Sequence, residues 1–190
     1  FGGDALTEDS TAVAGRRQLS VFIDHCKDRF GNNFVWVTGN HDSNYKCVSS
    51  IWASAKEGYL TDSLLFETAI KPFSELYVFD TLMISKSALI FEKNRADFEG
   101  WIRQHYYYDD QSIKTRFIVL ESGNFGQMAS VLSNKAIGLV QWQYEFVEAA
   151  LKSASSGYNI VFVMHNWATS EADLKGWFVG SNKDRQIYVV

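Results

Sequence analysis

Cysteine, net charge and long apolar runs are all scarce in this chain of 190 residues, and each scarcity excludes a class of protein. The two cysteines, Cys26 and Cys47, do not provide the disulfide framework of a small secreted domain. No run approaches the roughly 20 apolar residues that a membrane-spanning helix needs. Lys and Arg number 18 against 22 Asp and Glu, and the net charge of −4 does not indicate a general nucleic-acid-binding surface.

Several catalytic signatures are also absent. The chain has no Walker-type phosphate loop, no Gly-x-Ser-x-Gly nucleophile elbow and no Cys-x-x-Cys pair. The opening Gly2-Gly3-Asp4 matches the start of the nucleotide-cyclase signature Gly-Gly-Asp-Glu-Phe, but Ala5 follows where that signature needs a carboxylate. The sequence therefore excludes the cyclase interpretation.

The apolar pattern predicts an α/β fold in one domain. Hydrophobic residues make up 46% of the chain, and helical spacing alternates with short buried runs. The expected helices are 10–30, 47–57, 61–70, 97–104, 138–154 and part of 167–175. Gly31 is expected to end the first of them, and Lys71-Pro72 to end the helix 61–70. The expected strands are 34–38, 106–108 and 115–121 as a hairpin, 159–164 and 186–190. Residues 76–92 fit strands or a short helix equally well. The inward side chains expected in 138–154 are Leu139, Trp142, Phe146, Ala149 and Ala150.

Three groups of polar residues lie at points where strands are expected to end. Asn40, His41 and Asp42 come directly after the run 34–38, and His165 follows the run 160–164. Asp4 lies in the turn-like Gly2-Gly3-Asp4 at the start. Ligands of open α/β sheets bind at the carboxyl ends of strands, so Asp4, Asn40 and His165 are expected to meet in one cleft. A carboxylate, an amide oxygen and an imidazole suit Mn, Fe or Zn better than Ca.

These residues carry a family resemblance. Gly3-Asp4, then Gly39-Asn40-His41-Asp42, then His165 followed by Asn166 resemble the second, third and fourth of the five metal-binding blocks of calcineurin-like metallophosphoesterases. The segments 116–122 and 141–147 resemble that family's mid-domain strand and the helix before its fourth block. The resemblance implies a sandwich of two mixed β-sheets flanked by helices. It makes 1–190 a single partial domain with a possible cap or insert at about 43–110.

The resemblance also implies roles for the individual residues. Asp4 would bridge two divalent metal ions (Mn, Fe or Zn), and Asn40 and His165 would bind one of them. His41 would donate a proton to the leaving oxygen, and Asp42 would orient the backbone or the imidazole. The implied reaction is hydrolysis of a phosphomonoester or phosphodiester by a metal-activated water.

Two blocks of the family are missing from the chain, namely Asp-x-His at the first strand and Gly-His-x-His at the end. We therefore expect these residues to be a piece of a longer polypeptide, truncated at both ends. The segment would keep three of four ligands for one metal and only Asp4 for the other, so activity would depend on flanking residues. Substrate identity and oligomeric state stay open, because no motif selects among the family's substrates. The compartment stays open as well, because no targeting segment is visible.

Two functions from other classes compete with the hydrolase. The domain would be a degenerate phosphoesterase serving as a binding or structural module of a larger phage or surface assembly, or a regulatory domain with one metal and no turnover. Each candidate residue also has an ordinary interpretation: Asp4 and 39–42 as turns, and His165 as a strand-end histidine. His25 and His105 are expected to be structural, with His105 a weak candidate for substrate contact. The aromatic residues of 43–110 are expected to form a local core.

Overall fold

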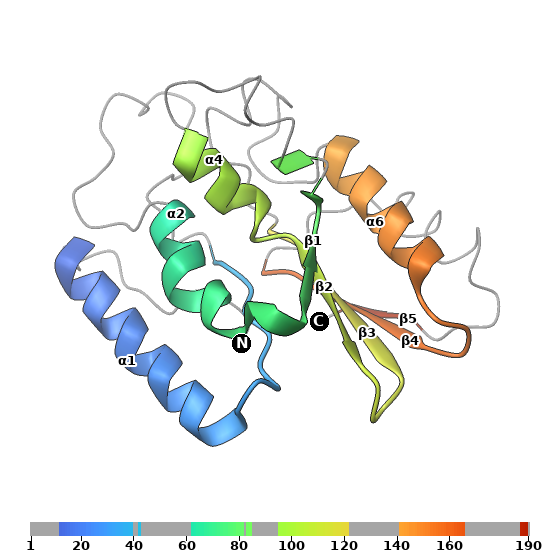
Figure 1. Cartoon of the computed structure of the whole chain (residues 1–190), viewed down its shortest axis with the longest axis horizontal. Coiled ribbons are helices and arrows are strands. Elements are labelled where there is room, and N and C mark those ends of the chain that lie inside the picture. Colours follow the sequence, from blue (N-terminus) through green and yellow to red (C-terminus); the bar gives the residue numbers. More distant parts are fainter. Residues whose placement is uncertain are drawn as a thin grey trace.

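The structure is a computed structural model, and it describes residues 12–39, 42, 62–81, 83–84, 95–121, 141–165 and 187–189. These residues form a mixed α/β arrangement in which helices cover both faces of a sheet (Figure 1). The predicted α/β class is confirmed. None of the described helices is both long and apolar enough to cross a membrane.

The sheet has the strand order β1-β2-β3-β4-β5. Its strands are β1 (Tyr77–Phe79), β2 (Tyr106–Asp110), β3 (Thr115–Val119), β4 (Asn159–Val163) and β5 (Ile187–Val189). The pairs β1–β2 and β2–β3 are antiparallel, whereas β3–β4 and β4–β5 are parallel. Every strand except β2 therefore runs in the same direction, and the carboxyl ends of β1, β3, β4 and β5 lie at one edge of the sheet.

Most of the predicted strands are present. The hairpin β2–β3 is confirmed. The strands predicted over 159–164 and 186–190 are present as β4 and β5. Residues 106–108 lie in β2, which has a neighbour on each side. The open segment 76–92 contains β1, and helical residues at 81 and 83–84 follow it. The described parts of 43–110 thus supply β1 and β2 to the same sheet as β3, β4 and β5.

Four of the expected helices appear within the described residues. They are α1 (Ala12–Phe30), α2 (Asp62–Leu65) with its continuations Phe66–Ile70 and Lys71–Leu76, α4 (Arg95–Ile102) and α6 (Gln141–Ser153). Helix α1 ends as predicted at Gly31, which has φ +60° and donates its N–H to the Lys27 carbonyl at 2.8 Å. Phe66–Ile70 is a π-helix and Lys71–Leu76 a 3₁₀ helix. The predicted segments 47–57 and 167–175 lie outside the described residues.

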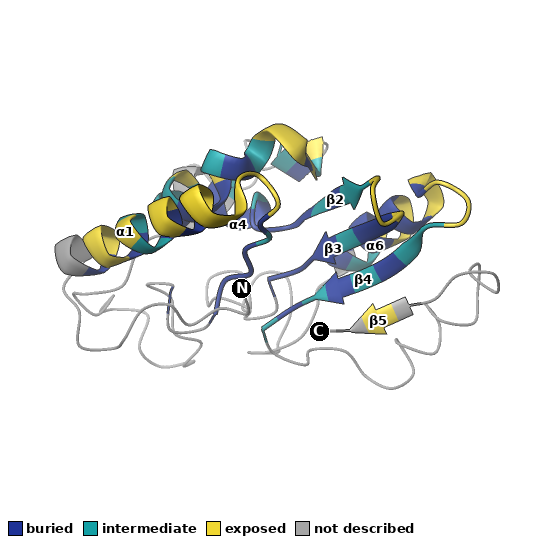
Figure 2. Cartoon of the chain, turned by 90° about the horizontal axis from the view of Figure 1, so that it is seen from below, coloured by how far each residue is buried: buried dark blue, intermediate teal, exposed yellow. Residues whose placement is uncertain are grey.

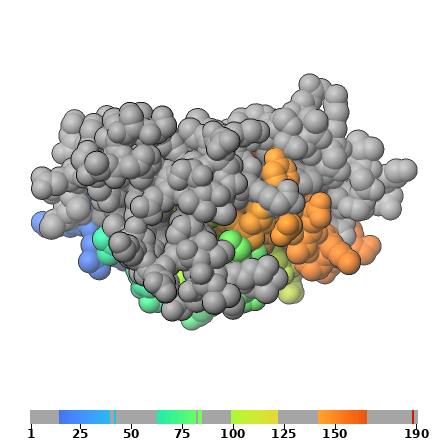
Figure 3. All heavy atoms as spheres, turned by 90° about the horizontal axis from the view of Figure 1, so that it is seen from above, coloured from blue at the N-terminus to red at the C-terminus, as the bar shows by residue number. Residues whose placement is uncertain are grey.

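Helix α6 covers one face of the sheet. Its buried side chains Phe146, Val147 and Ala150 pack with Ile118 and Phe162 of the strands. The outer side of α6 is exposed at the surface, as the space-filling view shows in orange (Figure 3). The prediction that Ala149 faces inward is wrong, because 149 lies on that outer side while Val147 takes a core position.

The opposite face of the sheet packs against α1, α2 and the residues that continue α2. Leu19, Ile23 and Cys26 of α1 are buried in this cluster, and the exposed side of α1 points away from it (Figure 2). His25 lies on that exposed side, as expected. Phe73 and Trp101 are each 1% exposed, which confirms a core role for these two aromatic residues of 43–110.

Residues 34–39 are extended and, apart from the half-buried Val35, buried, but they form no ladder with the described strands. The strand predicted over 34–38 is therefore wrong. Tyrosine hydroxyls bind the backbone of this segment where a neighbouring strand would otherwise do so. The Tyr77 hydroxyl donates to the Phe34 carbonyl. The Tyr106 hydroxyl donates to the Trp36 carbonyl at 2.7 Å and accepts the Trp36 N–H at 3.0 Å.

Both tyrosines suit this role because of their burial. Desolvation raises the pKa of Tyr77 and of Tyr106, so each hydroxyl stays protonated and remains a donor. On its other side the segment meets α1, where the ring of Phe22 packs edge-on against Trp36 with centroids 6.3 Å apart. Residues 34–37 therefore form a layer between α1 and the sheet.

Candidate functional site

The direction of residues 33–39 decides where the motif 39–42 lies. Phe34 is level with Tyr77 and Trp36 with Tyr106, through the tyrosine hydrogen bonds. In the sheet register Tyr77 lies opposite Tyr108, and Tyr106 lies opposite Phe79. From Phe34 to Trp36 the segment therefore advances in the direction of β1, and hence of β3 and β4. Its carboxyl end reaches the edge of the sheet at which those strands end.

His165 lies at the same edge. The register of β3 and β4 pairs Val119 with Val163, and the Leu120 N–H still donates to the Val163 carbonyl at 3.0 Å. Glu121 and His165 follow the ends of these two strands at the same edge. His165 itself lies at a bend, two residues after the end of β4. The His165 side chain is half-buried.

Asp42 stabilises the backbone of the motif. Its carboxylate oxygen Oδ2 accepts the Gly39 N–H at 2.9 Å, and its own N–H donates to the Gly39 carbonyl at 3.1 Å. The side chain is fully buried. The sequence indicates that Asp42 orients either the backbone or the imidazole, and these two hydrogen bonds correspond to orientation of the backbone. The carboxylate contributes to the site by fixing the turn that begins at Gly39.

Asp4, Asn40 and His41 lie outside the described residues, so the structure reports no position for them. Within the described part of the chain, no group of three or more His, Cys, Asp and Glu side chains is arranged to hold a metal ion. Two of the five predicted site residues, Asp42 and His165, can thus be located. Both lie at the carboxyl end of a segment that runs with the parallel strands.

A buried polar cluster that the sequence does not predict lies at the same edge. It joins Trp101 of α4, His105, Glu121 and Gln143 of α6. The Trp101 indole N–H donates to Glu121 Oε2 at 3.0 Å, and Gln143 Nε2 donates to the Glu121 carbonyl at 2.7 Å. All four side chains are almost completely inaccessible to water. The cluster connects the helices of the two faces to the residue that follows β3.

The hydrogen bonds fix the state of His105. Its Nδ1 lies 3.0 Å from the Trp101 carbonyl and 3.1 Å from the Ile102 carbonyl, so Nδ1 carries the proton. Its Nε2 then accepts from Gln143 Nε2 at 2.7 Å, the shorter of its two contacts, and lies 3.3 Å from the Glu121 carbonyl oxygen. Burial lowers the pKa of His105 to about 4, which keeps the ring neutral near pH 7. The structural interpretation of His105 is therefore confirmed, and the ring is not placed to contact a substrate.

One signal in the sequence points to this cluster. Gln143 lies between the core residues Trp142 and Phe146 on the inward side of an amphipathic helix, where a polar side chain needs a buried partner. Trp142 is a second polar link, because its indole N–H donates to Asp80 Oδ2 at 2.5 Å. The identity of the partners depends on the fold and cannot be deduced from spacing.

An open pocket of about 480 Å³ lies on the other side of α4, between the π-helix, the 3₁₀ helix and β1. Arg103, Phe66 and Phe79 line it together with two acidic side chains, Glu67 and Glu99. Neither the pocket nor the role of Arg103 is evident in the sequence. Comparison with protein-family models, curated proteins and solved structures finds no match for this chain.

Proposed function

We propose that this chain belongs to a metal-dependent phosphoester hydrolase whose active site lies at the carboxyl edge of the sheet. The observation that carries the proposal is the shared direction of 33–39 and β4. Because both run toward the same edge, the Gly39 turn and His165 come to one side of the molecule although they are more than a hundred residues apart. A turn and a strand-end histidine with ordinary structural roles would not need this agreement.

The donor set fits a divalent transition metal. Asp4, Asn40 and His165 would supply a carboxylate oxygen, an amide oxygen and an imidazole nitrogen, which suit Mn, Fe or Zn. A metal bound there supplies Lewis acidity toward the phosphoryl oxygens and lowers the pKa of a water. The second metal that the resemblance implies would share Asp4 and would need ligands from outside this chain.

The chain's own residues would do the remaining work. Asp42 holds the backbone at Gly39. His41 would donate the proton that the leaving oxygen requires, a contribution of roughly 10²–10⁴-fold in rate. The proposal extends to the fold: the buried, extended layer 34–37 between α1 and the sheet is where a strand of a second sheet would lie in a sandwich.

Metal content and turnover test the proposal together. The full-length protein, purified without chelators, should contain a transition metal by elemental analysis and hydrolyse p-nitrophenyl phosphate or bis(p-nitrophenyl) phosphate. Asn40→Ala and His165→Ala should lose metal and activity. His41→Ala should keep the metal and lose most of its turnover.

His25→Ala is the matched control, since His25 is exposed on α1 and is not one of the proposed site residues. It should leave both metal content and turnover unchanged. If neither Asn40→Ala nor His165→Ala loses metal, the proposed ligands are refuted. Metal bound normally without hydrolysis of either ester would refute the enzyme and favour the regulatory or structural module.

A further inference from the structure

The pocket beside α4 contains a cation whose hydrogen-bond donors are not used. The Arg103 guanidinium lies over two aromatic rings, 5.3 Å from the centroid of Phe66 and 5.9 Å from that of Phe79. Within the described part of the chain, no ion pair and no side-chain hydrogen bond involves this guanidinium. Cation–π contacts hold a guanidinium through its face and leave the N–H groups in its plane available.

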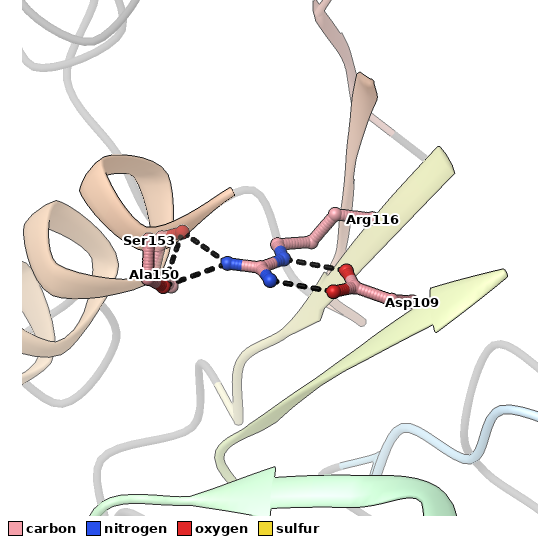
Figure 4. A network of polar contacts seen from close by, with 4 residues as sticks. All are labelled: Asp109, Arg116, Ala150 and Ser153. Atoms are coloured by element: carbon pink, nitrogen blue, oxygen red, sulfur yellow. Dashed lines mark hydrogen bonds and ion pairs between the residues drawn. The ribbon is translucent and has the colours of Figure 1, made fainter. Parts of the chain in front are cut away.

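Arg116 shows what a structural arginine looks like in the same molecule. Its guanidinium also lies over an aromatic ring, 3.9 Å from the centroid of Tyr107. Its N–H groups, however, are bound by Asp109, by the Ala150 carbonyl and by Ser153 (Figure 4). Arg116 has aromatic support and bound donors, whereas Arg103 has only the aromatic support. Among the described residues, the donors of Arg103 therefore differ from those of Arg116 in having no acceptor.

The aromatic support of Arg103 depends on an irregular helix. In the π-helix Phe66–Ile70 the Lys71 N–H donates to the Phe66 carbonyl, five residues earlier. Phe66 then packs edge-on against Phe79 of β1, with centroids 6.0 Å apart. Both rings lie under the guanidinium and both line the pocket. A π-turn costs hydrogen-bond geometry and is frequent at functional sites.

The other charges of the pocket define the kind of ligand. Among the described lining residues, the cations are Lys71 and Arg103 and the acids are Glu67 and Glu99. Lys71 Nζ is paired with Glu67 Oε2 at 2.5 Å, whereas no carboxylate in the described part of the chain is paired with Arg103. A polyanion would be repelled by the acids. A ligand with one oxyanion and several hydroxyl groups matches the arginine and the hydroxyls of Ser63 and Ser74.

We propose that this pocket binds a small polyhydroxylated molecule that carries one oxyanion, and that Arg103 binds the oxyanion through two parallel N–H···O bonds. Such bidentate recognition is the geometry in which arginine binds both phosphate and carboxylate. The volume of about 480 Å³ lies within the range of small-ligand sites. The inference does not depend on the proposed metal site.

A calorimetric or NMR titration of the protein in EDTA tests the proposal, because the chelator removes any metal that could bind phosphate elsewhere. The probes are glucose 6-phosphate, gluconate and glucose at constant ionic strength. We expect one or both anions to bind with Kd of about 1 mM and neutral glucose to bind at least tenfold more weakly. Binding of glucose 6-phosphate alone would identify a phosphate site, and binding of gluconate alone a carboxylate site.

Arg103→Met should weaken anion binding at least tenfold. Arg103→Lys should weaken it less, because the charge remains while the fork is lost. Arg17→Met on the exposed side of α1 is the matched control and should bind normally. Thermal melting of each variant shows whether it is folded at the titration temperature. Equal affinity of the wild type and a folded Arg103→Met variant, or no anion binding to the wild type, would overturn the proposal.

Discussion

The strongest stability prediction concerns Arg116, which joins three elements of the fold. From β3 its Nε and Nη2 each bind a carboxylate oxygen of Asp109 on β2 at 2.6 Å. Its Nη1 binds the Ala150 carbonyl at 2.5 Å and the Ser153 hydroxyl at 2.8 Å, near the carboxyl end of α6. Replacing Arg116 with Met keeps an unbranched apolar side chain and removes all these bonds.

The size of the effect follows from the burial of the two partners. The Arg116 side chain is 4% exposed and that of Asp109 is 30% exposed. Breaking a fully buried pair costs about 3–5 kcal/mol, mostly because the remaining charge is left without a partner. Asp109 can recover part of its hydration, so we expect Arg116→Met to lower the free energy of unfolding by about 2–4 kcal/mol. For a chain of this size that corresponds to a fall in Tm of roughly 4–16 °C.

Urea denaturation and calorimetry of Arg116→Met, Asp109→Leu and the double variant provide the measurement. The double variant should be more stable than Arg116→Met, since it removes the unpaired carboxylate. Arg17→Met on exposed α1 should change stability by less than about 0.5 kcal/mol. A loss below 0.5 kcal/mol in Arg116→Met would refute the reasoning, and so would a double variant that simply adds the two single losses.

Three further predictions follow from other contacts. Because the pKa of His105 is lowered to about 4 in the fold, protonation of this side chain favours the unfolded chain. The stabilisation is complete above pH 6.5 and declines toward pH 4, by at most about 1.4 kcal/mol per pH unit. His105→Gln should flatten this slope, whereas His25→Gln should not. Tyr106→Phe should lower the free energy of unfolding by about 1–3 kcal/mol in urea denaturation, whereas Tyr108→Phe, which loses a weak contact of 3.4 Å, should cost under about 0.5 kcal/mol. Gly31→Ala should lower the free energy of unfolding by about 1 kcal/mol and lower Tm accordingly. The cost comes from the positive φ alone, because nothing lies within 4 Å of the added methyl group, and Gly31→Asn should cost less.

The parts of the fold that the sequence predicts are those set by local periodicity. Helix α1 follows from the helical spacing of Leu19, Ile23 and Cys26, and its end follows from Gly31. Strand β4 follows from an uninterrupted apolar run. The same kind of run misleads at 34–38, because buried extended chain looks alike whether or not a neighbouring strand pairs with it. Its hydrogen-bond partners come from β1 and β2, and no local pattern indicates which.

Packing between distant elements explains what the sequence could not show. The apolar pattern of 61–70 predicts a helix correctly, but it does not distinguish the π-turn of Phe66–Ile70 from a regular α-helix. The state of Arg103 depends on where Phe66 and Phe79 meet, which only the fold decides. Asp42 is the opposite case, since its bond to Gly39 spans only three residues and a turn at 39–42 is the ordinary interpretation of that segment.

The tyrosines link the fold to the candidate site. Tyr77 and Tyr106 lie on neighbouring strands, stack with ring centroids 4.1 Å apart, and bind the backbone of the segment that leads to Gly39. The position of the motif is therefore set by side chains of the sheet, through bonds that a single substitution can remove. If the proposed site is correct, Tyr106→Phe should weaken metal binding as well as stability, although Tyr106 supplies no ligand. Tyr108→Phe should change neither. A Tyr106→Phe variant that is destabilised but keeps wild-type metal affinity would show that the turn holds its position without the sheet.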